Sequence, residues 1–131
     1  MPELSKTKAP PVVLVVDNDE RVAVILRTYL EPRGYRVEVC ADSFDVPGRI
    51  SATAAQLVLL DVLMPGTSGL EACRRIRAGG LKLPVVMLSS QGTPKDVERA
   101  CAAGADDYVT KPVNLKILEA ALSRLLHGKG K

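Results

Sequence analysis

The sequence predicts an α/β domain in which helices cover both faces of a parallel β-sheet. Short apolar runs that end in polar or turn residues alternate five times with segments whose apolar residues recur at helical spacing. Several of these runs are apolar throughout, which is typical of parallel strands buried between helices. The chain has 131 residues, 47% of them hydrophobic, and this fits one domain with its own core. We therefore expect a doubly wound five-stranded sheet with five helices and right-handed crossovers.

The first strand is predicted at residues 12–16, a run of valine and leucine that stops at Asp17-Asn18-Asp19. A helix follows, because apolar residues recur at helical spacing over residues 22–30 before Pro32-Arg33-Gly34 ends them. Residues 35–41 alternate in hydrophobicity and predict the second strand. Val37 and Val39 are expected on one face of it.

The second helix has the least regular pattern. Pro47-Gly48 lies where this helix should begin, and a glycine there lowers helix stability by about 1 kcal/mol. We therefore expect a short or frayed helix. The residues expected to face the core are Phe44, Val46 and Ile50.

The third strand, residues 57–61, runs straight into a carboxylate, Asp61. A Pro-Gly turn follows, and Ser68 with Glu71 three residues later has the spacing of a capping box that opens the third helix. Gly79-Gly80 ends this helix. Its expected inner face is Leu70, Cys73 and Ile76.

The fourth strand, residues 84–90, ends in two serine hydroxyls. Thr93 is the expected cap of the fourth helix and Pro94 its first residue. The expected inner face of that helix is small and consists of Ala100, Cys101 and Ala103.

The fifth strand, residues 106–111, ends in Lys111, and Asn114 is expected to cap the last helix. A leucine stripe on that helix is expected to belong to the core, and Gly128 to end it. The stripe consists of Leu115, Leu118, Leu122, Leu125 and Leu126. We expect residues 1–11 to be a disordered lead-in, 12–127 to be the domain, and 128–131 to be a flexible tail.

Composition argues against several functional classes. The net charge is only +3, and the one tight basic cluster, Arg74-Arg75-x-Arg77, lies in a predicted helix, where it is expected to be a solvated face. Aromatic residues make up 3% of the chain and tryptophan is absent, which argues against a base-stacking surface and a nucleic-acid partner. A single histidine, His127, excludes a histidine pair or cluster within one chain.

The cysteines and the N-terminal sequence indicate a reducing compartment. Cys40, Cys73 and Cys101 are odd in number and isolated, so they predict buried thiols and no disulfide framework. No signal-peptide core or membrane-spanning apolar run is present, so we expect a cytoplasmic protein without a membrane partner.

Polar residues end four of the five predicted strands: Asp17 with Asn18, then Asp61, Ser89 and Lys111. Only the second strand ends in nothing reactive, at Cys40, which fits an edge position. In an open parallel sheet, ligands bind at the carboxyl ends of the strands. If the second strand lies at the edge, the other four ends meet beside the first strand.

This constellation resembles the receiver domain of bacterial two-component response regulators over about residues 12 to 127. The family implies the flavodoxin-like strand order 2-1-3-4-5, which agrees with the edge position of the second strand. The motifs that carry the resemblance are Val16-Asp17-Asn18-Asp19, Leu60-Asp61-x-x-Met64-Pro65-Gly66-x-x-Gly69, Leu88-Ser89-Ser90 and Tyr108-x-x-Lys111-Pro112.

The resemblance implies phosphorylation of Asp61 by the phosphohistidine of a histidine kinase or phosphotransfer protein, or by a small acyl phosphate. It implies Mg²⁺ as cofactor, because an anionic nucleophile must approach an anionic phosphoryl group. Lys111 would neutralise phosphate charge, and Ser89 would donate a hydrogen bond to the phosphate. Such a domain is not an enzyme acting on other molecules, but it assists its own phosphorylation and dephosphorylation. The metal ligands implied are Asp17, Asp61, the backbone carbonyl of Leu63, and Asn18.

The family also implies a switch in which Ser89 moves toward the phosphate and Tyr108 turns inward. This remodels the face made by the fourth helix, the fifth strand and the last helix for a partner, a homodimer or a fused output domain. Pro112 is expected to follow a cis peptide bond that turns Lys111 into the pocket.

Asn18 departs from the family pattern, which has a second acid at this position. The lost charge is worth up to about 4 kcal/mol at 4 Å and an effective dielectric of 20, so we expect weak Mg²⁺ binding. Asp19 is the candidate to compensate. The alternative function is a pseudo-receiver, a protein-interaction module without magnesium-dependent phosphorylation. A flavin or nucleotide binder is disfavoured, because no glycine-rich phosphate loop follows the first strand.

Overall fold

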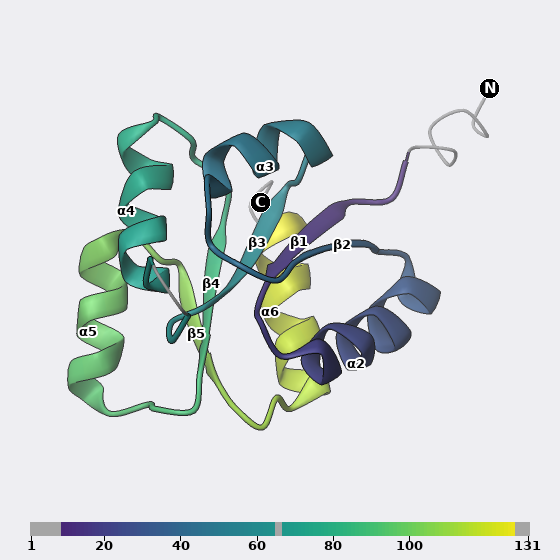
Figure 1. Cartoon of the computed structure of the whole chain (residues 1–131). Coiled ribbons are helices and arrows are strands. Elements are labelled where there is room, and N and C mark those ends of the chain that lie inside the picture. The colour runs from purple at the N-terminus through teal and green to yellow at the C-terminus, as the bar shows by residue number, and fades with distance from the viewer. Residues whose placement is uncertain (1–8, 65–66, 128–131) are drawn as a thin grey trace.

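The computed structural model describes residues 9–64 and 67–127 (Figure 1). One parallel sheet has the strand order β2-β1-β3-β4-β5, which confirms the predicted fold class and the edge position of β2. The strands are β1 (Val12–Val16), β2 (Arg36–Cys40), β3 (Leu57–Asp61), β4 (Val85–Ser89) and β5 (Asp107–Thr110). The α-helices of the described residues are α2 (Glu20–Leu30), α3 (Val46–Thr53), α4 (Gly69–Ala78), α5 (Pro94–Ala103) and α6 (Leu115–His127), and a 3₁₀ turn, η1 (Glu31–Arg33), follows α2.

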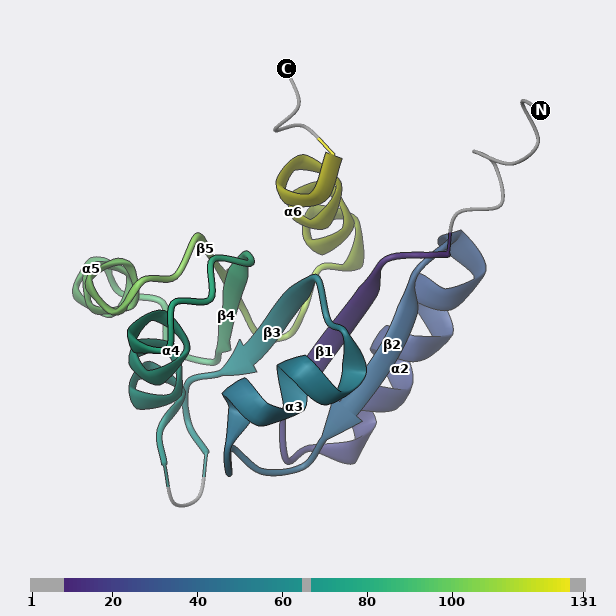
Figure 2. The same cartoon turned by 90° about the horizontal axis from the view of Figure 1, so that it is seen from above.

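Helices cover both faces of the sheet, and each face has its own core (Figure 2). Leu26 and Leu30 of α2 pack with Leu118 and Leu122 of α6 on one face. On the other face α3, α4 and α5 contribute Val46, Ile50, Ala72, Cys73, Ile76, Ala100 and Ala103. The strands β3 and β4 are buried on both sides, as their continuous apolar runs predict.

The register of the strands aligns their carboxyl ends. Val16 at the end of β1 pairs with both Cys40 and Leu60, and Asp61 pairs with Leu88. Asp61 and the residues that follow β1, β4 and β5 therefore share one edge of the sheet, the lower edge in Figure 1.

The predicted helix caps are present. Ser68 Oγ accepts the backbone N–H of Glu71 at 3.2 Å, and Asn114 Oδ1 accepts that of Ile117 at 3.0 Å. Thr93 and Asp96 form a reciprocal capping box at the start of α5. The helix α3 is short, with eight residues, as expected from its Pro-Gly start. The Pro65-Gly66 turn and the expected stop at Gly128 lie outside the described residues.

Phe44 and Cys101, which were expected to be buried, are exposed, and so is Val39. Phe44 is 75% exposed because it precedes α3, which begins only at Val46. Val39 lies on the same face of β2 as Val37, yet it is 37% exposed in this edge strand. Cys101 points outward from α5, so the expectation of three buried thiols was wrong for this one.

The helix α5 is held by little apolar surface, since its buried side chains are two alanines, Ala100 and Ala103. Its C-terminal end is held by Arg77 of α4, whose Nε and Nη2 donate to the Gly104 carbonyl at 3.0 and 2.8 Å. The same guanidinium reaches Asp106 at 2.9 Å. The prediction that these arginines form a solvated face is therefore confirmed for Arg74 and Arg75, which are exposed, but is wrong for Arg77.

The described residues contain no helix that is long and apolar enough to cross a membrane. Most of the expected lead-in, residues 1–8, and the expected tail, residues 128–131, lie outside the described ranges.

Candidate functional site

Two carboxylates and one ammonium meet at the aligned strand ends. The Lys111 Nζ lies 2.8 Å from Oδ2 of Asp17 and 3.2 Å from Oδ2 of Asp61. Asp17 and Asp61 are buried, at 1% and 5% exposure, because each follows directly on a buried run of its strand. The structure thus brings together three of the residues singled out in the sequence.

Asp61 is difficult to ionise. Burial raises the pKa of its carboxyl group, and the nearby Asp17 carboxylate raises it further. The Lys111 ammonium and the backbone N–H of Leu63, which donates to Oδ1 at 3.1 Å, oppose this rise in pKa. The net direction is upward because burial is the largest effect.

The positive charge of Lys111 partly neutralises the negative charges of Asp17 and Asp61. Burial alone would lower the pKa of its ammonium group, but Asp17 and Asp61 outweigh burial and raise it. The Lys111–Pro112 peptide bond is cis, as expected. The backbone N–H of Lys111 donates to the Ser89 carbonyl at 2.8 Å, which ties β5 to β4 beside the cluster.

Asn18 and Asp19 lie outside this buried cluster. Asn18 is exposed, and Asp19 caps α2, where its Oδ1 accepts the backbone N–H of Arg21 at 2.9 Å. That hydrogen bond lowers the pKa of Asp19. The backbone N–H of Asp19 donates to Oδ1 of Asp17 at 2.9 Å, so this residue contributes its N–H to the site while its carboxylate serves the helix.

Ser89 and Tyr108, the expected switch residues, both contact Gln91. Ser89 is buried, and its Oγ accepts the backbone N–H of Gln91 at 3.0 Å. The half-buried Tyr108 donates its hydroxyl hydrogen to the Gln91 carbonyl. The loop after β4 therefore links the buried hydroxyl to the aromatic side chain of β5.

Ser43 and Gly69 support the loop after Asp61; Ser43 was missed in the sequence, and Gly69 was recognised there only as part of a motif. Ser43 is buried and donates its hydroxyl hydrogen to the carbonyl of Thr67. Gly69 packs against the end of β3 so closely that a Cβ would lie 2.2 Å from the Asp61 carbonyl oxygen. An isolated serine carries no sequence signal, but a glycine at the first residue of a helix was a usable one.

Comparison with known proteins decides the family. The response regulator receiver domain family matches residues 13–123. The chain belongs to this family.

Relatives and solved structures agree with this assignment to the receiver domain family. The phosphate regulon transcriptional regulatory protein PhoB of Rhizobium meliloti is 36% identical over 118 residues, 88% of this chain and 52% of that protein. Response regulator MprA of Mycobacterium sp. strain KMS is 38% identical over 89% of this chain and 51% of that protein. A two-component response regulator from Clostridium difficile has a TM-score of 0.86 at 25% identity, covering 92% of this chain and 99% of that one.

The chain spans about half the length of the curated relatives it matches. The family assignment and the fold apply to the receiver domain itself.

The donor set of this receiver domain fits a hard divalent cation. Asp17 and Asp61 are both buried, and Oδ2 of each contacts the Lys111 ammonium, so two carboxylates lie side by side at the strand ends. Carboxylate and carbonyl oxygens suit Mg²⁺. Residues 9–64 and 67–127 contain no group of three or more histidine, cysteine, aspartate or glutamate side chains arranged for a metal. A cation at this site would therefore have Asp17 and Asp61 as acidic ligands and neutral oxygens as the others.

Proposed function

We propose that this receiver domain accepts a phosphoryl group on Asp61 and thereby switches a binding surface. The donor would be the phosphohistidine of a histidine kinase or phosphotransfer protein, or a small acyl phosphate. The observation that carries the proposal is the contact of Lys111 with Asp61 at 3.2 Å beside a second buried carboxylate, Asp17.

We also assign residues 12–127 to the receiver domain, 1–11 to the lead-in and 128–131 to the tail.

Each residue of the site has a task in this transfer. An oxygen of Asp61 attacks phosphorus, and Lys111 balances the charge of the phosphate oxygens, as an ammonium point charge can. Ser89, buried at the end of the neighbouring strand, would donate a hydrogen bond to the phosphate. Asp17, Asp61, the Leu63 carbonyl and Asn18 would hold Mg²⁺. When bound, this ion supplies charge neutralisation between the anionic nucleophile and the phosphoryl group.

The link through Gln91 supports a route from the site to the surface. Phosphorylation adds about 1.5 to 2 negative charges next to Ser89, whose Oγ now accepts a hydrogen bond from Gln91. If the Ser89 hydroxyl turns toward the phosphate, the backbone N–H of Gln91 loses its acceptor. The loop after β4 is then less restrained, and Tyr108, which donates to the Gln91 carbonyl, is free to change its position. The face of α5, β5 and α6 is then rearranged for a partner protein, a second copy or an output domain.

A pseudo-receiver is the second candidate, and one observation favours it. The residue after Asp17 is a neutral, exposed asparagine, and the next carboxylate, Asp19, already caps α2. If Asp19 replaced the missing acidic ligand at position 18, its carboxylate would have to leave the N-terminus of α2, and a helix cap worth about 1 kcal/mol would be lost. A constitutive interaction module would keep the α5, β5 and α6 face without using phosphate.

Intact-mass spectrometry under mild conditions separates the two candidates. Incubation with acetyl phosphate and Mg²⁺ should add one phosphoryl group to the wild-type protein and none to Asp61→Asn. Glu98→Gln is the matched control, because it neutralises an exposed carboxylate on α5 and should leave the adduct intact. Absence of an adduct from both a small donor and a cognate kinase would establish the pseudo-receiver instead.

A further inference from the structure

A cavity of about 530 Å³ opens beside Lys111, between the start of α2 and the loop that leads to α6. This volume is in the range of sites for small organic ligands. Most of its wall is apolar, and the side chains that form this part are Val22, Ile25, Leu26, Pro112 and Val113. Lys111 belongs to the wall and also contacts Asp61, so the cavity adjoins the phosphoryl-accepting site.

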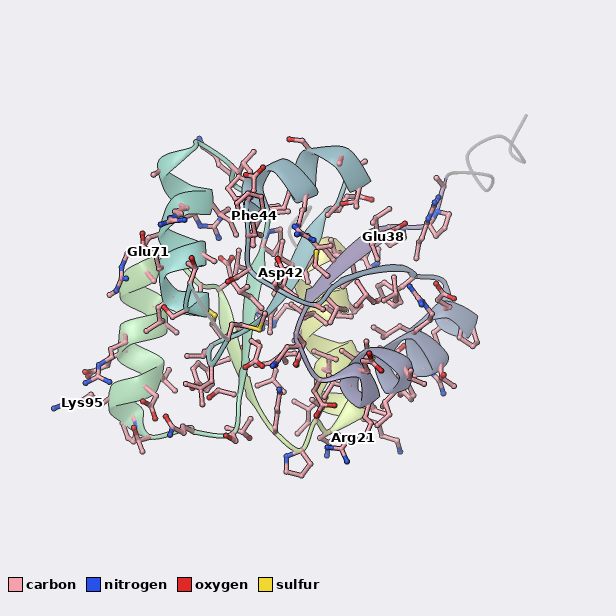
Figure 3. All side chains as sticks on the ribbon, viewed as in Figure 1. Arg21, Glu38, Asp42, Phe44, Glu71 and Lys95 are labelled. Carbon is pink, nitrogen blue, oxygen red and sulfur yellow. The ribbon has the colours of Figure 1, made fainter. Side chains whose placement is uncertain are left out.

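A second cation, Arg21, lies at the same cavity. Figure 3 shows it at the end of α2 that faces the loop between β5 and α6. Its side chain is 89% exposed, and its only ion pair within the described residues is a 3.4 Å contact with Asp19. An exposed pair of this kind contributes little to stability, so the guanidinium can turn toward an anion in the cavity.

We propose that this cavity is the subsite for the acyl group of a small acyl phosphate donor and that it favours acyl chains longer than acetyl. The proposal rests on phosphorylation of Asp61. An oxygen of Asp61 forms a bond to phosphorus, the bond from phosphorus to the acyl oxygen breaks, and its electron pair leaves on the carboxylate. No proton, oxidant or reductant is needed for this balance.

The cavity matches both ends of such a donor. Lys111 faces the phosphoryl group, the apolar wall receives the hydrocarbon chain, and Arg21 is placed to pair with the carboxylate that departs. Each methylene buried against the apolar wall should raise the apparent second-order rate constant by up to about fourfold. The phosphoryl group alone would use only the Lys111 end of the site.

The experiment compares acetyl phosphate, butyryl phosphate and phosphoramidate as donors to the wild-type protein. Acetate and butyrate are leaving groups of nearly equal basicity, so the ratio of their rate constants reports binding of the chain. We expect butyryl phosphate to react about tenfold faster than acetyl phosphate. A ratio of one, with adduct still formed from phosphoramidate, overturns the subsite and leaves the proposed function standing. No adduct from any donor overturns both.

Two neighbouring residues of α2 provide matched variants. Ile25 is 51% exposed and belongs to the cavity wall, whereas Val24 is 62% exposed and does not. Ile25→Asn should bring the butyryl-to-acetyl ratio to about one, and Val24→Asn should keep the wild-type ratio. The ratio is independent of the fraction of folded protein. Equal ratios in all three proteins contradict the proposal, and slower transfer to Ile25→Asn from a phosphohistidine protein alone would assign the cavity to that partner.

Discussion

The ammonium nitrogen of Lys111 lies 2.8 Å from Oδ2 of Asp17, a carboxylate that is almost fully buried. Its distance to Asp61 is longer, 3.2 Å. The proposed phosphoryl acceptor is therefore the less well compensated of the two carboxylates, which agrees with the raised pKa of Asp61. Ionised Asp61 therefore lowers the free energy of unfolding of the metal-free protein.

Asp61→Asn should stabilise the metal-free protein at neutral pH. The raised pKa means that ionised Asp61 lowers the free energy of unfolding, and a neutral amide removes that penalty. We expect a rise in Tm of about 2 to 6 °C, the effect of roughly 1 kcal/mol in a domain of this size. As the pH falls through the folded-state pKa of Asp61, the gain should shrink, and it should vanish below the unfolded-state pKa of about 3.9. An unchanged or lower Tm at pH 7 would contradict the assigned pKa direction.

Asn18→Asp should tighten Mg²⁺ binding and speed phosphorylation by small donors. A third carboxylate next to Asp17 and Asp61 adds one negative charge for a hard cation, so we expect Kd to fall about tenfold, or 1.4 kcal/mol. The same charge should lower metal-free stability by like-charge repulsion. Calorimetric titration of both proteins measures the first effect, and thermal unfolding without metal measures the second. Equal affinities would mean that position 18 is not a ligand.

Ser43→Ala should loosen the loop that follows Asp61. The Thr67 carbonyl loses its donor, which should lower the free energy of unfolding by about 1 to 2 kcal/mol and speed amide exchange at Leu63. Ser51→Ala is the control, since Ser51 is an exposed serine of α3. Hydrogen exchange read residue by residue tests this, and identical Leu63 rates in both variants would show that Ser43 does not hold the loop.

Tyr108→Ala should weaken self-association of the phosphorylated protein more than Arg74→Ala with Arg75→Ala. Tyr108 lies on the proposed α5, β5 and α6 face, whereas the two arginines are exposed on α4 and pair with Glu71. We expect a loss of about tenfold or more for the tyrosine and less than twofold for the arginine pair. Analytical ultracentrifugation measures both, and the opposite ranking would move the interface to α4.

One of the three cysteines should react quickly with a thiol-specific disulfide reagent. Cys101 is exposed, whereas Cys40 and Cys73 are buried and burial raises the pKa of the Cys73 thiol. The Cys101→Ser variant should lose the fast phase and keep the slow reaction that follows unfolding. A fast phase of two or three thiols in the native protein would show that a buried cysteine becomes accessible.

Local sequence patterns were sufficient for the edge position of β2 and for the central cluster, whereas the full strand order followed from the family resemblance. Strand patterns that stop at Asp17, Asp61 and Lys111 mark where three strands end, and the parallel arrangement of these strands brings the three ends together. The cis bond before Pro112 followed only from the family resemblance. The roles of these residues in phosphoryl transfer remain predictions.

The sequence was insufficient where a neighbour decides the outcome. Periodicity assigns Val39 and Cys101 to a face of their element but cannot say whether another element covers that face. Arg77 looks like a member of a surface cluster, and only the approach of Gly104 from a distant part of the chain turns it inward. Ser43 likewise has its acceptor 24 residues away.

The two-alanine inner face of α5 sets how easily this helix can be displaced. A small shift of α5 would uncover Ala100, Ala103 and the half-buried Val97, whereas the same shift of α4 would uncover the fully buried Cys73 and Ile76. Because Arg77 hydrogen-bonds to the Gly104 carbonyl, we expect the opposite end of α5, at Thr93, to move more easily than the Gly104 end. A protein that binds α5 would therefore contact a helix whose more easily displaced end follows the loop in which Gln91 contacts both Ser89 and Tyr108.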